Sequence, residues 1–299
     1  MKTLLFTGAS GFLGNNIIDD LNEIYSVDTL GFATSDTYYV DISTSRPELR
    51  KNYDIILHAA GKAHVIPKND KEEQEFYDTN YKGTKNLCES LKIVGPPKSF
   101  IFISTVAVYG LEEGNLINED FPLNGDTPYA KSKILAEQFL KKWCKNHAVK
   151  LTILRPSLLA GKNPPGNLYS MLNGIKNNRY FSIAGGKSRK SIAMANDIAK
   201  LIPLCVENDG IYNLCDSHNP SFHELEKLIC SQVNKKKPIN IPYPLALIFA
   251  KIGDFIGSNA PINTLKLDKI TKSLTFSNKK IINELGFIPS DVLSNFIIE

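Results

Sequence analysis

The chain has 299 residues, of which 42% are hydrophobic and 22% charged, with a formal net charge of +4. This composition supports a full hydrophobic core, excludes a disordered chain, and gives no support to a nucleic-acid-binding surface. Its five cysteines show no CxxC pair or metal-ligand spacing, so we expect reduced thiols in a cytoplasmic protein without a metal site. No stretch approaches the ~20 apolar residues of a membrane span.

The first predicted element is a short buried strand over residues 4–6, which leads into three glycines and an apolar-periodic helix. Gly8, Gly11 and Gly14 are spaced GxxGxxG rather than GxGxxG. Glycine lets a backbone turn sharply and approach a ligand closely, and a helix N-terminus offers unpaired N–H groups to a pyrophosphate. The stretch therefore indicates dinucleotide binding, with a plain turn as the alternative.

Strand and helix patterns then alternate along the first half of the chain. Strands are predicted at residues 27–30, 38–40, 55–60, 100–103 and 151–154, and helices at residues 72–91 and 128–144. Such alternation indicates βαβ units in an α/β, doubly wound parallel sheet. Ligands of such sheets bind beyond the carboxyl ends of the strands.

The alternation loosens after Pro156. The patterns there predict strands at 180–183 and 211–214, helices at 168–175 and 223–233, an amphipathic helix at 245–256, and a solvated lysine turn at 235–237. We therefore expect a dinucleotide-binding domain over residues 1–160 and a mainly substrate-binding portion over residues 161–299, interleaved with the first domain.

Tyr129 and Lys133 form the sharpest chemical pattern. They lie four residues apart at the start of a predicted helix and therefore share one face of it. A nearby ammonium favours phenolate, so we expect a lowered tyrosine pKa and a general acid/base role, whereas an isolated pair would simply be an exposed helix face. Ser104 and Thr105 follow the strand at 100–103, at the end of the sheet that carries the glycines, where a hydroxyl can contact a substrate oxygen.

Together these motifs resemble the extended short-chain dehydrogenase/reductase superfamily, and within it the NAD-dependent epimerase/dehydratase family of nucleotide-sugar enzymes. The matching segments cover most of the chain: TGASGFLG at 7–14, HAAG at 58–61, NYKGT at 80–84, STVAVYG at 104–110, YAKSK at 129–133, LRPSLLAG at 154–161, KSIAMANDIA at 190–199 and GIYNLCD at 210–216. The resemblance implies a Rossmann fold with a smaller C-terminal substrate-binding portion.

The resemblance also implies the site residues. Tyr129 would be the catalytic base with Lys133 as its partner, and Thr105, or as second choice Ser104, would contact the reacting sugar oxygen. The implied cofactor contacts are Gly8, Ser10, Gly11, Phe12, Leu13, Gly14, Asp41, Ile42, Ala59, Ala60, Gly61, Asn80, Ile103, Tyr129, Lys133 and Pro156. The implied substrate contacts are His64, Thr105, Asn167, Arg189 and Lys190.

Two departures from the family pattern are informative. Val106 and Ala107 stand where dehydratases of this family carry an Asp-Glu pair, which argues against a 4,6-dehydratase. Gly31 ends the second strand. At this position an acidic residue usually hydrogen-bonds the ribose of NAD, whereas in NADP-binding proteins a nearby arginine binds the phosphate. Asp28 lies too early and Asp36 too late for that position, so NAD and NADP both stay open, with NAD preferred.

The resemblance implies an NAD(P)-dependent 4-epimerase of a UDP-hexose or UDP-N-acetylhexosamine, acting by transient oxidation at C4 in polysaccharide biosynthesis. The alternatives are a 4-ketoreductase of a 4-keto-6-deoxy nucleotide sugar and, in another class, a non-catalytic NAD(P)-binding sensor or scaffold, whose usual mark is loss of the tyrosine or lysine. The partner would be a nucleotide-diphosphate sugar, with a homodimer formed through the helix that carries Tyr129 and the long helix before it. His58 is expected to be structural.

Overall fold

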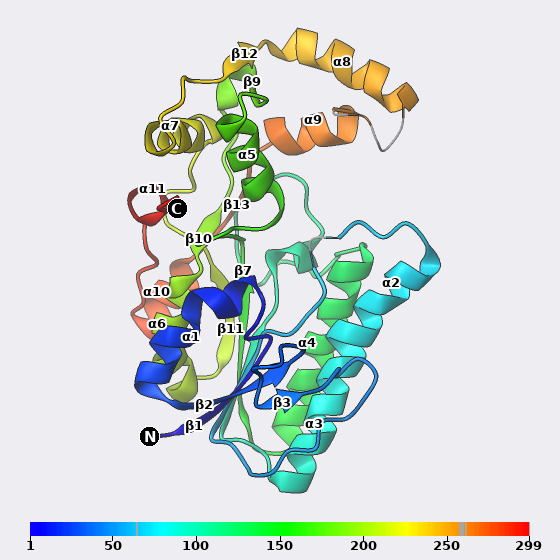
Figure 1. Cartoon of the computed structure of the whole chain (residues 1–299), viewed down its shortest axis with the longest axis vertical. Helices are drawn as coiled ribbons and strands as arrows, with labels where there is room; N and C mark the ends of the chain where they lie inside the picture. Colours follow the sequence, from blue (N-terminus) through cyan, green and yellow to red (C-terminus); the bar gives the residue numbers. More distant parts are fainter. Residues whose placement is uncertain (64, 257–259, 261, 299) are drawn as a thin grey trace.

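The computed structural model describes residues 1–63, 65–256, 260 and 262–298. A seven-stranded sheet lies at its centre, and every pairing within that sheet is parallel, as the alternating pattern predicted (Figure 1). In spatial order its strands are β11 (Gly210–Leu214), β7 (Lys150–Pro156), β5 (Ser99–Ile103), β4 (Ile55–His58), β1 (Thr3–Thr7), β2 (Ser26–Gly31) and β3 (Tyr38–Tyr39). The strand order reverses beside β1, which is where ligands bind in such sheets.

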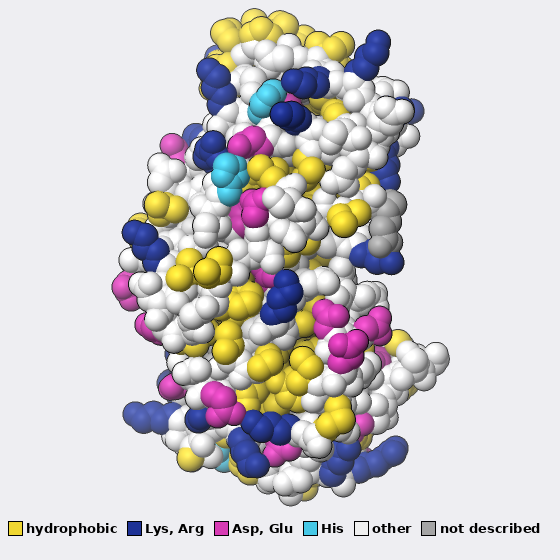
Figure 2. Space-filling view, turned by 90° about the vertical axis from the view of Figure 1, so that its left-hand side faces the viewer, with side chains coloured by type: hydrophobic (Ala, Val, Ile, Leu, Met, Phe, Trp, Pro, Cys, Tyr) yellow, Lys and Arg dark blue, Asp and Glu magenta, His cyan; other side chains and the backbone are white. Residues whose placement is uncertain are grey.

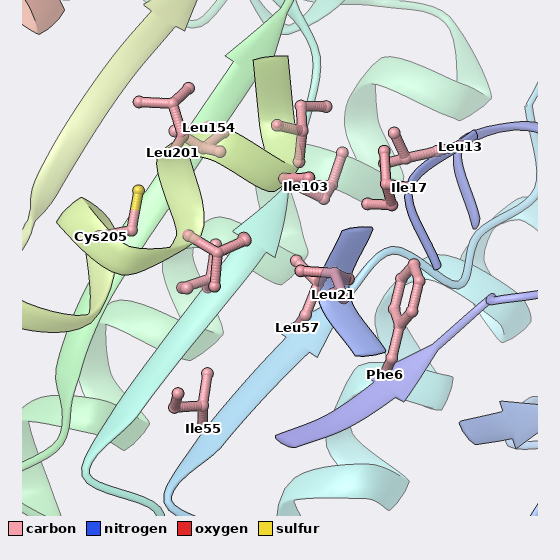
Figure 3. Close-up of a cluster of buried hydrophobic side chains, with 14 of the residues drawn as sticks. Phe6, Leu13, Ile17, Leu21, Ile55, Leu57, Ile103, Leu154, Leu201 and Cys205 are labelled. Carbon is pink, nitrogen blue, oxygen red and sulfur yellow. The ribbon is translucent and has the colours of Figure 1, made fainter. Parts of the chain in front are cut away.

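Two hydrophobic cores cover the two faces of this sheet. Successive strand residues point to opposite faces, so Phe6 packs under α1 (Phe12–Ile24) and α6 (Asn196–Glu207), while Leu5 packs under α3 (Gly83–Val94) and α4 (Pro128–Asn146). Figure 3 shows the first core, in which Ile17 of α1 and Leu201 of α6 meet side chains of the central strands. Because both faces are buried, the strands are continuous apolar runs.

The predicted helix at 72–91 is divided into three segments. These are α2 (Asp70–Phe76), the π-helix η1 (Tyr77–Lys82) and α3. The wider turns of a π-helix interrupt the 3.6-residue period, so the prediction of one regular helix was wrong at this point. The interruption places Asn80 in the interior, at 1% exposure, facing α4.

The second half of the chain contributes to two regions. β11, α6 and α10 belong to the central sheet and its cover, whereas most of the remaining elements form a smaller lobe at one end of the molecule (Figure 1). The remaining helices are α5 (Gly166–Lys176), α7 (Phe222–Gln232), α8 (Tyr243–Ile256), α9 (Thr264–Thr271), α10 (Lys279–Leu285) and α11 (Val292–Asn295), with a 3-10 turn η3 (Ala184–Gly186). Three two-stranded parallel sheets pair β10 (Ile192–Met194) with β8 (Leu158–Ala160), β12 (Ile239–Ile241) with β9 (Phe181–Ile183), and β13 (Leu274–Phe276) with β6 (Gly114–Ile117).

The cysteines are all free and buried, as their spacing predicted. None of the described helices is long and apolar enough to cross a bilayer.

Candidate active site

A groove of about 590 Å³ runs along the carboxyl ends of β1, β2 and β4. Among the residues predicted to contact the cofactor, those that line it are Gly8, Ser10, Gly11, Asp41, Ile42, Ala59, Ala60 and Gly61. The other lining residues were not among the predicted contacts, although the sequence analysis placed Gly31 at the ribose position; they are Leu30, Gly31, Phe32, Val40, Ser43, Lys62, Glu75 and Thr79. Leu30 and Gly31 end β2, and Phe32 and Val40 directly follow β2 and β3, so their position at a strand end was an available signal.

The three glycines have different structural roles in this groove. Gly8 has a φ of +82°, and a Cβ on it would lie 2.7 Å from the backbone nitrogen of Ala60. A Cβ on Gly14 would lie 2.0 Å from the Ala9 carbonyl oxygen, so this glycine allows α1 to pack against the loop. Gly11 is the N-cap of α1 and supplies no side-chain acceptor, which leaves the first N–H groups of the helix available to an anion. The loop therefore fits a dinucleotide pyrophosphate.

Other predicted cofactor residues have partners within the protein. Leu13 belongs to the first core, where Figure 3 shows it near Ile17. Asn80 donates to Ser132 Oγ at 2.9 Å and accepts from the Lys62 backbone N–H at 2.8 Å, so it ties η1 to α4 and to the loop after β4. Phe12 opens α1, while Ile103 and Pro156 end β5 and β7.

Tyr129 lies in the first turn of α4, at the end of β5. Pro128 follows the N-cap residue Thr127, whose hydroxyl accepts from the Ala130 N–H at 3.2 Å and sets the start of the helix. The Thr105 hydroxyl lies beside the Tyr129 side chain. Burial raises the pKa of Tyr129, and the neighbouring Thr105 hydroxyl offsets part of the rise. The lowered pKa expected from the sequence was therefore wrong in direction for the protein alone.

Lys133 is buried one turn further along α4. Its ammonium donates to the Ile103 carbonyl oxygen at 2.9 Å and lies 4.7 Å from the centroid of the Phe102 ring. Burial lowers the pKa of Lys133 to about 8, although the nearby Glu137 carboxylate acts in the opposite direction. A Cβ on Gly61 would lie 3.2 Å from the Lys133 Nζ, so the lysine is next to the floor of the groove.

Ser104 takes part in a buried network instead of facing the groove. Its hydroxyl donates to Glu137 Oε1 at 2.6 Å. Arg155 donates to both Glu137 oxygens, at 3.0 and 2.6 Å, and to the Tyr109 hydroxyl at 3.0 Å. The Tyr109 hydroxyl in turn donates to Asn213 Oδ1 of β11 at 2.7 Å. Of the two hydroxyls predicted to contact substrate, Thr105 is the one that lies beside Tyr129.

The predicted substrate residues lie mainly in the smaller lobe. Asn167 is exposed in the first turn of α5, and Arg189 donates to the Asn219 carbonyl oxygen at 2.9 Å. Lys190 is partly buried, and burial lowers its pKa. His64 lies outside the described residues.

His58 is structural, as predicted. Its Nδ1 and Nε2 lie 2.6 and 2.9 Å from the hydroxyls of Thr7 and Thr84, and burial with the nearby Lys133 lowers its pKa to about 3. The part of the chain that the structure describes contains no group of histidine, cysteine and carboxylate side chains suited to a metal ion.

Comparison with known proteins agrees with this geometry. Residues 4–215 match the family described as the NAD dependent epimerase/dehydratase family. An Escherichia coli O157:H7 protein, N-acetyl-alpha-D-glucosaminyl-diphospho-ditrans,octacis-undecaprenol 4-epimerase, is 27% identical over 308 residues, covering 97% of this chain and 92% of that protein. The UDP-glucose 4-epimerase of Vibrio cholerae is 25% identical over 317 residues, with coverages of 98% and 92%.

A solved structure also shares the fold. The UDP-glucose 4-epimerase of Thermotoga maritima, crystallised with UDP-glucose, superposes with a TM-score of 0.73 at 21% identity, covering 98% of this chain and 96% of that one.

Proposed function

This chain belongs to the NAD-dependent epimerase/dehydratase family as an enzyme of the extended short-chain dehydrogenase/reductase type, and from that membership we propose that it is a sugar 4-epimerase. Its substrate would be a hexose or N-acetylhexosamine carried on a diphosphate, with the UDP-linked sugar as the first choice. The two relatives named above both act at C4 of a diphosphate-linked sugar by their names. The observation that carries the proposal is the grouping of Thr105, Tyr129 and the buried Lys133 at the end of β5, next to the cofactor groove.

The residues at this point support proton transfer without elimination. The Tyr129 Oη would take the proton of the sugar C4 hydroxyl, and the Thr105 hydroxyl would hold that oxygen in place. The buried Lys133 ammonium would stabilise the phenolate form and orient the cofactor ribose. When bound, a nicotinamide dinucleotide would supply the hydride acceptor and donor for the sugar C4 carbon. Val106 and Ala107 bring no carboxylate into the turn after Thr105, which is consistent with epimerisation and not with loss of water.

NAD is the cofactor that we propose. The Asp36 carboxylate accepts from the Ala33 N–H at 2.8 Å, and a Cβ on Gly31 would lie 2.7 Å from the same Asp36 oxygen. Although Asp36 comes late in the sequence, the turn after β2 carries its carboxylate back to the strand end. An acidic group at this position favours a ribose hydroxyl and repels the phosphate of NADP.

Calorimetric titration of NAD and NADP tests the cofactor. Asp36→Asn should weaken NAD binding and narrow the preference for NAD over NADP. Asp41→Asn is the matched control, because the family resemblance places Asp41 at the adenine, which NAD and NADP share, so the change should affect both cofactors alike. Tighter binding of NADP by the unaltered protein would contradict the proposal.

The reaction is tested by incubating the protein and NAD with UDP-N-acetylglucosamine or UDP-glucose and following the C4 epimer by NMR. Epimer should form without net change in nicotinamide absorbance. Tyr129→Phe should lower the rate by about 10²–10⁴-fold, whereas Tyr81→Phe, whose ring packs against that of Phe139 in α4, should not. Net oxidation of NADH or NADPH with a 4-keto sugar nucleotide alone would establish a 4-ketoreductase instead.

A further inference from the structure

Helix α8 buries its small residues and exposes its large ones. Ala246, Ala250 and Gly253 face the interior, where a Cβ on Gly253 would lie 1.8 Å from the Ile262 carbonyl oxygen. The opposite side, which we term the α8 face, consists of Leu245, Ile248, Phe249, Ile252, Phe255 and Ile256. A helix of a water-exposed surface normally has the reverse arrangement, with its large apolar side chains in the core.

The α8 face is wholly apolar and strongly exposed. Its members are between 44% and 94% exposed, and Phe255 is the most exposed of them. They recur at spacings of three and four residues, which places them along one side of the helix. The charged residues of α8, Lys251 and Asp254, fall outside this row. A continuous apolar surface of this kind marks an interaction site.

The α8 face lies at the outer end of the smaller lobe. In Figure 1 α8 is the outermost element, with α9 between it and the rest of the molecule. Figure 2 shows hydrophobic side chains covering that end, with lysine and arginine side chains gathered around it. No other described helix lies over α8 in Figure 1, so the α8 face is free to contact a flat partner.

The segment around α8 is strongly basic. Residues 227–272 carry eight lysines and two aspartates, a net charge of +6 where the whole chain carries +4. The triple-lysine turn, Lys235 to Lys237, leads into β12 and then α8. Lys272 pairs with Asp268 at 2.9 Å, and the lysine run remains in excess over the acidic groups of this segment. The partner must therefore offer both hydrocarbon and negative charge.

We propose that the α8 face docks on the surface of an anionic lipid bilayer. An amphipathic helix with large apolar residues on one side and lysines near it lies in the plane of the membrane interface, with its apolar side among the acyl chains. Anionic headgroups attract the surrounding lysines and strengthen this contact. A second copy of the chain fits less well, because two such basic ends would repel each other. This inference concerns the surface alone and does not depend on the reaction proposed above.

Co-sedimentation with vesicles tests this proposal. The full-length protein should sediment with vesicles of phosphatidylethanolamine and phosphatidylglycerol, and less with phosphatidylcholine alone. Combined Ile252→Ser and Phe255→Ser substitutions should lower the partition coefficient at least about tenfold, because they remove two of the large apolar groups that would be buried. Ile93→Ser, at an exposed position of α3 that is 68% accessible, is the matched control and should leave binding unchanged.

Two further measurements distinguish loss of membrane binding from loss of folding and from self-association of the protein. Thermal unfolding of the double variant should match that of the unaltered protein, since both substituted side chains are exposed. Light scattering without lipid should give the same mass for both proteins. Absence of binding to anionic vesicles, equal binding by the double variant, or an oligomer that dissociates in the double variant would each overturn the proposal.

Discussion

Replacing Arg155 by methionine should destabilise the protein by about 3–5 kcal/mol, because it leaves a buried carboxylate without its cation. Arg155 is 1% exposed and Glu137 is fully buried, and the two form two charge-assisted hydrogen bonds at 3.0 and 2.6 Å. In Arg155→Met the Glu137 carboxylate would retain the Ser104 hydroxyl as its donor. One neutral donor does not compensate a desolvated charge.

The double variant Arg155→Met with Glu137→Gln separates this explanation from loss of packing. Removing both charges avoids the uncompensated carboxylate, so the double variant should recover about 2 kcal/mol relative to the single one. Urea unfolding, followed by far-UV circular dichroism, measures both free energies. If the double variant were as unstable as Arg155→Met or less stable, the cost would come from the lost volume of the arginine, and the electrostatic reasoning would be refuted.

Three further predictions concern the glycine stretch, the buried histidine and a helix cap. Burial holds the pKa of His58 at about 3, below its usual 6.5. Between pH 6.5 and pH 3 the unfolded chain therefore binds more protons than the folded protein, and the folded protein loses stability as the pH falls through this range. The urea midpoint of His58→Gln should therefore fall less steeply with acid than that of the unaltered protein; parallel curves would contradict this. Gly14→Ala should lower the free energy of unfolding by about 1–3 kcal/mol and weaken NAD binding, because the alanine methyl group would meet the Ala9 carbonyl oxygen at 2.0 Å. An unchanged NAD affinity by calorimetry would count against this prediction. Ser221→Ala should lower the free energy of unfolding, measured by thermal unfolding, by about 1 kcal/mol, since it removes the capping box that Ser221 forms with Glu224 at the start of α7. A loss below a few tenths of a kcal/mol would show that the cap is dispensable.

The parts of the site that could be predicted are those that depend on residues close together in the sequence. The strand–glycine–helix order and the four-residue spacing of Tyr129 and Lys133 depend only on neighbouring residues, so they could be recognised without coordinates. The central strands, continuous apolar runs such as residues 100–103, were equally recognisable because both of their faces are buried.

The remainder depends on contacts between distant segments. The pKa of Tyr129 is raised because the fold partly buries this tyrosine, whose ring lies 6.2 Å from that of Phe76 at the end of α2. Ser104 turns away from the groove because its hydroxyl donates a hydrogen bond to the Glu137 carboxylate of α4. The carboxylate of Asp36 reaches the end of β2 because of the turn after that strand. Apart from β9, which the pattern at residues 180–183 predicted, the three-residue strands of the smaller lobe are too short for a periodicity to appear.

The position of β11 has a consequence for how the chain is synthesised. This strand pairs with β7, yet more than fifty residues separate them in sequence. While the ribosome adds that connection, the backbone N–H and C=O groups along the outer side of β7 have no neighbour, in a sheet whose other strands are already complete. Such an unpaired edge is a template for association with other chains. Until β11 has been synthesised, the nascent chain therefore presents this edge of β7 for pairing with other chains.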